Sequence, residues 1–320
     1  MDSLAVKKNP PRLMAMREFI MLFILGGIVI VLCILSPAFA DAKNFINIFK
    51  QAAISGILAC GMMCVILTGG FDLSVGSIVG FSGVIAALFA QGNYPVVVPV
   101  FLAIASGLAV GLVNGACVSY LAIPAFVVTL GTQSIVRGLA YLASGGIPIF
   151  GVTRAYEKIA GGLLFNFVPL LVIYYVLIVL LFGYILSKTV YGRRIYMVGG
   201  NETSAKVSGI NVNAVKMSVY GICGLLAGAA GCLLTSRTIS GSPVTGSGYE
   251  LDAIAAVVIG GISLDGGSGK WYGSMIGALM LAVISNGLDI MRVPSYYQYL
   301  FKGSIIVIAV YLDVRSRAKQ

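Results

Sequence analysis

The chain has 320 residues, of which 59% are hydrophobic and 10% are charged, and its mean hydropathy is +1.00. This composition excludes an ordinary water-soluble domain, which needs charged side chains to hydrate its surface. The formal net charge is +10. We do not expect nucleic-acid binding, because the basic residues of membrane proteins gather in their cytoplasmic loops.

The longest uncharged segment is the run of 64 residues between Asp72 and Arg137. Only lipid can solvate such a segment, and a chain in lipid must satisfy its backbone hydrogen bonds within helices or a closed barrel. The apolar runs are continuous and do not alternate, which favours helices. With roughly 20 residues per span, the sequence predicts an all-α, polytopic membrane protein of about ten transmembrane helices in a single domain, residues 1–320.

Apolar runs separated by Gly, Pro and charged residues predict the positions of these spans. In chain order they are residues 19–38, 46–68, 75–90, 96–120, 125–144, 164–187, 214–236, 252–264, 271–289 and 296–312. An α-helix rises about 1.5 Å per residue, and the hydrocarbon core is about 30 Å thick. The third and eighth runs are too short to cross alone, so we expect broken or re-entrant helices there.

The distribution of Lys and Arg predicts the orientation of the spans. If the N-terminus is cytoplasmic, thirteen basic residues lie on the cytoplasmic side and six on the outer side, with Arg137 and Lys302 inside spans. Cytoplasmic loops carry the excess of basic residues in membrane proteins. We therefore expect both termini in the cytoplasm, and we expect Lys302 to reach the outer interface beside Tyr296 and Tyr297.

Two connections are long enough to carry a function. The cytoplasmic segment 188–216 is polar and basic and has room for a short helix, so we expect a cytoplasmic partner to dock there. The outer segment 237–249 is rich in Gly, Ser, Thr and Pro, which favour turns. That segment is either a flexible connector or a surface for a partner.

Polar residues inside the spans are the candidates for a substrate path, because a polar group in hydrocarbon is costly and normally faces a cavity or a partner. The candidates are Asp72, Ser74, Asn114, Thr129, Gln133, Arg137 and Asn286. Thr129, Gln133 and Arg137 follow each other at intervals of four, which places them on one helix face. Structural roles remain as alternatives: Asp72 can cap the helix that begins near Ser74, and the other residues can form hydrogen bonds between helices.

The sequence carries no recognisable enzyme site. It has no histidine, and its eleven carboxylates lie mostly at loop edges, so no metal site, proton relay or cofactor is predicted. Residues 266–271 resemble a phosphate-binding loop, but Leu264 and Trp271 stand where Gly and Ser or Thr are required. If ATP drives transport, a partner subunit must hydrolyse it. The hydroxyl and amide groups of the spans suit a neutral, hydroxyl-rich solute.

Glycine, with 41 residues, predicts close packing between helices. Pairs of glycines four residues apart occur in three spans, at residues 107, 111 and 115, at 224 and 228, and at 273 and 277. Small residues at this spacing let helix backbones approach closely in lipid. Residues 69–77 and 260–268 agree at five of nine positions, which leaves an internal repeat open.

Several motifs occur in a consistent order between residues 44 and 313. They are GFDLSVGS at 70–77, IPAFVVTLGT at 123–132, GGN at 199–201, SGINV at 208–212, YELDAIAAVVIGG at 249–261, SNGL at 285–288 and KG at 302–303. Together they resemble the ribose-type permeases of bacterial ABC sugar importers. At positions 71 and 262 that family commonly has Ile and Thr, whereas this chain has Phe71 and Ile262. These differences do not change the class of permease, but they leave open which sugar is transported.

The resemblance implies a permease of the bacterial inner membrane that forms a dimer with a second permease chain. It further implies a cytoplasmic ATPase with two nucleotide-binding modules, which uses the ATP, and a periplasmic sugar-binding protein that meets the outer segment 237–249. The positions implied as the ATPase contact lie in the coupling loop 188–216. They are Asn201, Glu202, Thr203, Ala205, Lys206, Val207, Ser208 and Gly209.

Two other functions remain open. A self-sufficient secondary carrier or channel would need no ATPase, but the sequence lacks a carboxylate relay. An ABC permease for branched-chain amino acids would need groups that complement both charged ends of its substrate.

Overall fold

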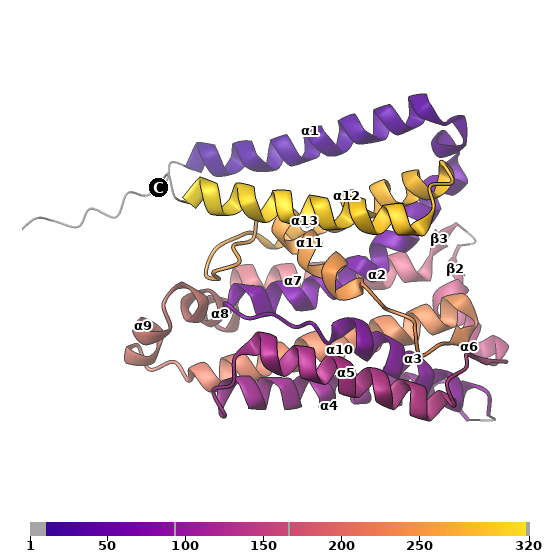
Figure 1. Ribbon diagram of the computed structural model, residues 1–320, viewed down its shortest axis with the longest axis horizontal. Coiled ribbons are helices and arrows are strands. Elements are labelled where there is room, and N and C mark those ends of the chain that lie inside the picture. Colours follow the sequence, from indigo (N-terminus) through magenta and orange to yellow (C-terminus); the bar gives the residue numbers. More distant parts are fainter. Residues whose placement is uncertain (1–10, 93, 166, 318–320) are drawn as a thin grey trace, which may run out of the picture.

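The computed structural model describes residues 11–92, 94–165 and 167–317, and its secondary structure is almost entirely helical (Figure 1). Within this part of the chain, six helices are long and apolar enough to cross a membrane. They are α2 (Ala42–Leu67), α4 (Val97–Ser119), α5 (Ala125–Ser144), α7 (Leu170–Lys188), α10 (Val212–Thr238) and α12 (Trp271–Ile290). The prediction of an all-α, polytopic membrane protein is confirmed.

Four further helices coincide with the remaining predicted spans. They are α1 (Pro11–Leu35), α3 (Val75–Ala90), α11 (Tyr249–Ile259) and α13 (Ser295–Arg317). The long helices lie side by side along the longest axis of the molecule (Figure 1). The start of α1 and the end of α13 lie at the same end of this bundle, as an even number of crossings requires.

Short elements fill the connections. At one end lie α8 (Val190–Gly200) and α9 (Glu202–Val207), and at the other end lie the 3-10 helix η1 (Pro37–Ala40) and the helix α6 (Arg154–Gly161) (Figure 1). The antiparallel pairs are β1 (Ile149–Phe150) with β4 (Ser240–Gly241) and β2 (Leu163–Leu164) with β3 (Val168–Pro169). The sixth predicted span begins at Leu170, and not at residue 164, because β2 and β3 form a hairpin there.

The two short predicted spans are short helices inside the bundle. With 16 and 11 residues, α3 and α11 extend about 24 Å and 16 Å, less than the hydrocarbon thickness. Between the end of α2 and the start of α3 the chain runs back along the bundle without helix (Figure 1). Irregular backbone at membrane depth is tolerated where protein or a cavity surrounds it. Both helices therefore begin or end inside the bundle.

Glycine pairs join α4 to α10, which with α2 forms the buried centre of the bundle. A Cβ atom on Gly107 would lie 2.8 Å from the Cα of Gly228, and one on Gly111 would lie 3.0 Å from the Cα of Gly224. The first separation is shorter than real Cβ contacts, and the second is tighter than nine in ten of them. The glycines predicted for close packing therefore set the distance between these two backbones.

The two similar segments, 69–77 and 260–268, meet at the end of the bundle that carries α8. The Gly267 N–H donates to the Leu67 carbonyl at 2.9 Å, and a Cβ atom on Gly266 would lie 2.8 Å from the Gly69 nitrogen. Gly266 has a φ of +87°, which favours glycine. The breaks after α2 and after α11 thus support each other.

Candidate functional site

A polar cavity of 240 Å³ lies between α3, α5 and the start of α11; we call it the chamber. The residues that line it are Ser77, Gln133, Ser134, Arg137, Ser247 and Glu250. Gln133 and Arg137 are one helical turn apart on α5, so the polar face predicted from their spacing does meet a cavity. All six lining residues are polar, which is unusual for a cavity within a bundle this apolar.

Hydrogen bonds tie α5 to the chain around the start of α11. The Arg137 Nη1 donates to the carbonyl oxygens of Pro243 and Thr245 at 2.5 and 2.8 Å. The Gln133 Nε2 donates to the Glu250 Oε1 at 3.2 Å. Arg137 and Glu250 also attract each other electrostatically. The chamber is therefore polar but close to neutral overall.

The sequence reasoning missed four chamber residues, namely Ser77, Ser134, Ser247 and Glu250. Glu250 was missed because the carboxylates were interpreted as loop-edge groups. Its side chain comes from the first turn of α11, and the residue is 8% exposed. A Cβ atom on Gly76 would collide with the Glu250 Oε2, so the glycine of α3 leaves room for the carboxylate. The sequence did contain a signal for this residue: Glu250 is an acidic residue in the first turn of an apolar helix, directly after a Gly- and Ser-rich segment.

Three predicted path residues form a separate buried cluster. The Asp72 Oδ1 accepts hydrogen bonds from the Ser74 N–H at 2.9 Å and from the Ser74 hydroxyl at 2.6 Å. The Asn114 Nδ2 donates to the Ser74 Oγ at 2.8 Å. None of the three has exposed surface. The Asp72 carboxylate therefore holds Ser74, the residue directly before α3, which is consistent with a structural role for Asp72 near the start of that helix.

Thr129 and Asn286 also lie away from the chamber. Thr129 is fully buried, and its hydroxyl donates to the Ala125 carbonyl of its own helix at 2.9 Å. Asn286 on α12 and Asn44 on α2 exchange two hydrogen bonds, each of 2.9 Å. Asn44 donates further to the Phe39 carbonyl. A reciprocal amide pair of this kind joins two helices.

Replacement of Asn286 by Leu is expected to destabilise the protein by about 1–2 kcal/mol, because the Asn44 amide loses its partner in an apolar environment. The double variant Asn44→Leu/Asn286→Leu should recover part of this loss, since no unpaired amide then remains between α2 and α12. Thermal unfolding in detergent measures both effects. A double variant that loses the sum of the two single effects would contradict the pairing.

A second polar cavity, of 390 Å³, lies between α2, α10, α11, α12 and α13. Lys302 lines it and forms an ion pair with Asp252 of α11, with the Nζ 2.9 Å from the Oδ2. The two side chains are 26% and 14% exposed, so Lys302 pairs with a neighbouring helix, and its place at the outer interface stays a prediction. The side chains of Tyr296 and Tyr297, in contrast, are exposed.

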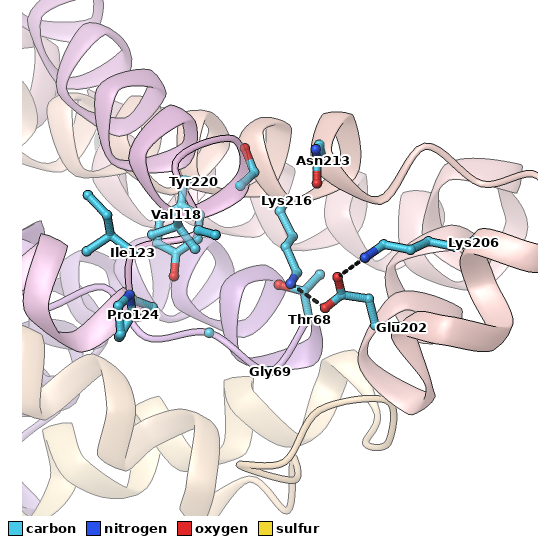
Figure 2. Close-up of a pocket in the computed structure, with 14 residues that line it drawn as sticks. Thr68, Gly69, Val118, Ile123, Pro124, Glu202, Lys206, Asn213, Lys216 and Tyr220 are labelled. Atoms are coloured by element: carbon cyan, nitrogen blue, oxygen red, sulfur yellow. Dashed lines mark hydrogen bonds and ion pairs between the residues drawn. The ribbon is translucent and has the colours of Figure 1, made fainter.

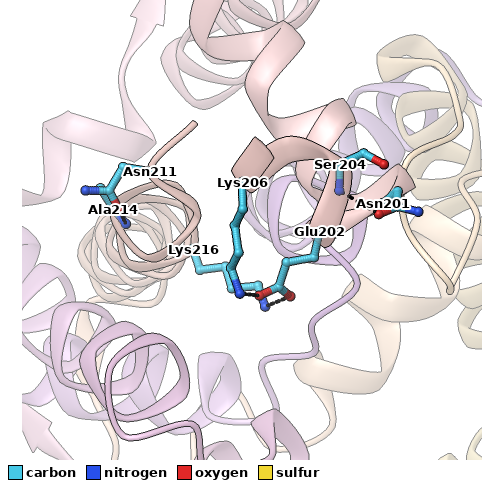
Figure 3. Close-up of polar contacts among 7 residues, drawn as sticks. All are labelled: Asn201, Glu202, Ser204, Lys206, Asn211, Ala214 and Lys216. Carbon is cyan, nitrogen blue, oxygen red and sulfur yellow. Dashed lines mark hydrogen bonds and ion pairs between the residues drawn. The ribbon is translucent and has the colours of Figure 1, made fainter. Parts of the chain in front are cut away.

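The segment 188–216, predicted as the coupling loop, forms the helices α8 and α9 at one end of the bundle (Figure 1), and Figure 3 shows the polar contacts around α9. The Asn201 side chain accepts a hydrogen bond from the Ser204 N–H at 2.8 Å at the start of α9. The Asn211 side chain accepts one from the Ala214 N–H at 3.0 Å at the start of α10. The predicted short helix is therefore present, and side-chain caps stabilise the start of α9 and the start of α10.

Glu202 forms two ion pairs, one with Lys206 within α9 and one with Lys216, which ties α9 to α10 (Figures 2 and 3). Its carboxylate lies 2.8 Å from the Lys206 Nζ and 2.6 Å from the Lys216 Nζ. Hydrogen bonds from Lys206, and then from Lys216, hold the pKa of Glu202 below its ordinary value of 4.5. The contribution of the pairs to stability is therefore complete at neutral pH and is lost as the pH falls through the lowered pKa.

Most of the residues predicted to contact an ATPase are exposed. Val207 is 86% exposed, whereas Ala205 is 1% exposed and anchors α9 to the bundle. The exposed positions are Asn201, Thr203, Lys206, Val207, Ser208 and Gly209. Beside them lies a cavity of 480 Å³ whose lining includes Glu202, Lys216 and Pro124 (Figure 2). An exposed apolar side chain among polar neighbours is typical of a contact surface.

Residues 44–310 match the family model described as "Branched-chain amino acid transport system / permease component". This chain belongs to that family of transport permeases. The matched residues include all of the helices from α3 to α12 and the lining residues of the three cavities described above. With its apolar helices, this permease is a multi-pass protein of the bacterial inner membrane.

Curated relatives cover nearly the whole permease. The ribose import permease protein of Bacillus subtilis (strain 168) is 42% identical over 94% of this chain and 92% of its own length. That of Escherichia coli (strain K12) is 40% identical over 94% of each chain. The xylose transport system permease protein of Haemophilus influenzae is 33% identical over 88% of this chain and 92% of its own length. No solved structure matches the chain.

Proposed function

We propose that this permease is the transmembrane subunit of an ATP-driven importer of a monosaccharide such as ribose. The observation that carries this proposal is the identity of 40–42% to ribose import permeases over more than nine-tenths of both chains. The all-polar chamber supports it, since a sugar needs hydrogen-bonding groups along its path.

Ten crossings with both termini in the cytoplasm are the topology that this function favours. The ten apolar helices α1, α2, α3, α4, α5, α7, α10, α11, α12 and α13 would make the crossings, with α3 and α11 completed by irregular backbone. The excess of basic residues at the end that carries α8 and α9 supports the orientation.

An importer of this kind needs three partners for the permease: an ATPase, a sugar-binding protein and a second permease chain. A cytoplasmic ATPase with two nucleotide-binding modules would dock on the coupling loop 188–216, and closure of its modules on ATP would push on α8 and α9. A sugar-binding protein would deliver substrate to the outer segment 237–249. A second permease chain, identical to the first, would complete the path, which alternates between outward and inward openings.

Two alternatives are less well supported. The family description names branched-chain amino acids, but the ribose and xylose permeases are 33–42% identical to this chain along its length. A secondary carrier would not need an exposed, capped docking element at one end of the bundle. Neither the chain's few carboxylates nor its lack of histidine favours catalysis by the permease itself.

Deletion of this chain from its source cells tests the proposal. We expect uptake of one labelled monosaccharide, with D-ribose tested first, to fall to background and to return with the restored chain. Uptake of labelled leucine should stay unchanged. Loss of leucine uptake with all sugar uptake intact would contradict the proposed function.

A charge exchange tests the role of the coupling loop. Glu202→Lys should lower sugar uptake several-fold, because it removes two ion pairs of about 1 kcal/mol or less each and gathers three lysines between α9 and α10. Adding Lys216→Glu should restore part of the uptake by forming the reversed pair. Quantitative immunoblots of membranes provide the control for insertion. Full uptake by the single variant would argue against a coupling role for this network.

A further inference from the structure

Two buried oxygen atoms in the chamber have no hydrogen-bond partner within the described part of the chain. They are the Glu250 Oε2 and the Ser77 Oγ. Both residues line the 240 Å³ cavity, and they are 8% and 0% exposed. A buried polar atom is costly unless it is satisfied, so an orphan pair on two residues that line the same cavity points to a place where a bound molecule can make hydrogen bonds once the side chains turn toward it.

The other groups of the chamber limit the chemistry of that molecule. The Gln133 amide is occupied by the second oxygen of Glu250, and the Arg137 Nη1 is occupied by two carbonyl oxygens. The free carboxylate oxygen requires a donor from the ligand, and the free hydroxyl of Ser77 accepts or donates. A sugar hydroxyl meets both requirements, because it donates and accepts at once.

The size and lining of the chamber also suit a sugar. Its 240 Å³ is far more than the roughly 15 Å³ that one water needs. Its lining consists of three serines, one glutamine and one pair of opposite charges, with no apolar side chain among the lining residues. A neutral polyol would find hydrogen-bonding groups on every lining residue and would leave the charge balance of Arg137 and Glu250 unchanged.

We propose that the chamber is the sugar-contact site of the permease, in which Glu250 and Ser77 bind hydroxyl groups of the passing solute and favour a neutral polyol over an amino acid. This inference rests on the proposed function, since it assigns the site through which that solute passes. It identifies two contact residues, Glu250 and Ser77, beyond those that the polar spacing on α5 predicts.

Uptake of labelled D-ribose by cells that hold the complete importer tests the assignment. Glu250→Gln keeps the shape of the side chain but removes the charged acceptor, and we expect the maximal uptake rate to fall about ten-fold or more. Ser77→Ala should cause a smaller loss in the same direction. Ser82→Ala is the matched control, because Ser82 lies on the same helix and is equally buried, but its hydroxyl donates to the Ile78 carbonyl.

Chemical protection provides a second measurement if Glu250→Gln lowers the amount of folded protein. Ser247 lines the chamber and is exposed, so a Ser247→Cys variant should react with a methanethiosulfonate reagent. D-ribose should slow this reaction during turnover and leucine should not. The unmodified chain corrects for its own cysteines, four of which are buried.

The outcomes separate this inference from the proposed function. Ribose uptake that neither substitution lowers, or labelling of the Ser247→Cys variant that ribose leaves unchanged, would overturn the assignment of the chamber while the permease remains a sugar importer. Leucine uptake by the unmodified importer, with protection by leucine, would overturn both.

Discussion

Substitution of Gly224 by Val is expected to prevent α4 and α10 from packing and to leave little folded permease in the membrane. A Cβ atom at this position would lie 2.8 Å from the Cα of Gly111, a backbone atom that cannot turn away as a side chain can. Overpacking costs about 3 kcal/mol at the upper end of its usual range. Because most residues in the apolar part of α10 are buried at the centre of the bundle, the loss affects the whole fold.

Thermal unfolding of the detergent-solubilised protein measures this effect. We expect the midpoint to fall by about 5–10 °C, or the variant to be absent from the membrane fraction. Gly27→Val is the matched control, since Gly27 also lies in an apolar helix but a Cβ atom there would meet nothing within 4 Å. Equal stability of the two valine variants would refute the close contact between α4 and α10.

Substitution of Val207 by Asp is expected to separate the permease from its ATPase. Val207 is an exposed apolar side chain at the tip of the coupling loop, and it is 86% exposed. If it fills a pocket of the partner, a charge there removes a central apolar contact, which is worth about 2 kcal/mol or more. The affinity should then fall at least about 30-fold.

Copurification of the ATPase with a tagged permease measures this loss. Phe165→Asp is the matched control, because Phe165 is 89% exposed but lies in the hairpin between β2 and β3, at the opposite end of the bundle. The control variant should retain the ATPase. Equal retention by both variants would show that α9 is not the docking element.

The positions of the helices could be predicted from the sequence because each span depends on a local apolar run. The third span was predicted at residues 75–90, and α3 has the same bounds, since Asp72 and the glycines before it end one helix and allow the next to begin. The hairpin at residues 163–169 was not predicted. Its Leu and Val residues are as apolar as those of α7, so hydropathy alone does not separate them.

The partners of buried polar residues could not be predicted in the same way. A polar residue in a span indicates that a partner exists, but the identity of the partner depends on how distant helices pack. Asn286 is bound by Asn44, which is 242 positions away, and Gln133 by Glu250, 117 positions away. The spacing on α5 therefore predicted that Gln133 and Arg137 face a polar site. That Glu250 belongs to the same site was established only by the structure.

Sugar transport by the reconstituted importer tests most directly that this chain is a gate driven by a separate ATPase. Liposomes would contain the permease with its ATPase, and the binding protein loaded with labelled D-ribose would be added outside. We predict accumulation of ribose with enclosed ATP, and none with a non-hydrolysable analogue or with the permease alone. Accumulation by the permease alone, without ATP, would contradict the account.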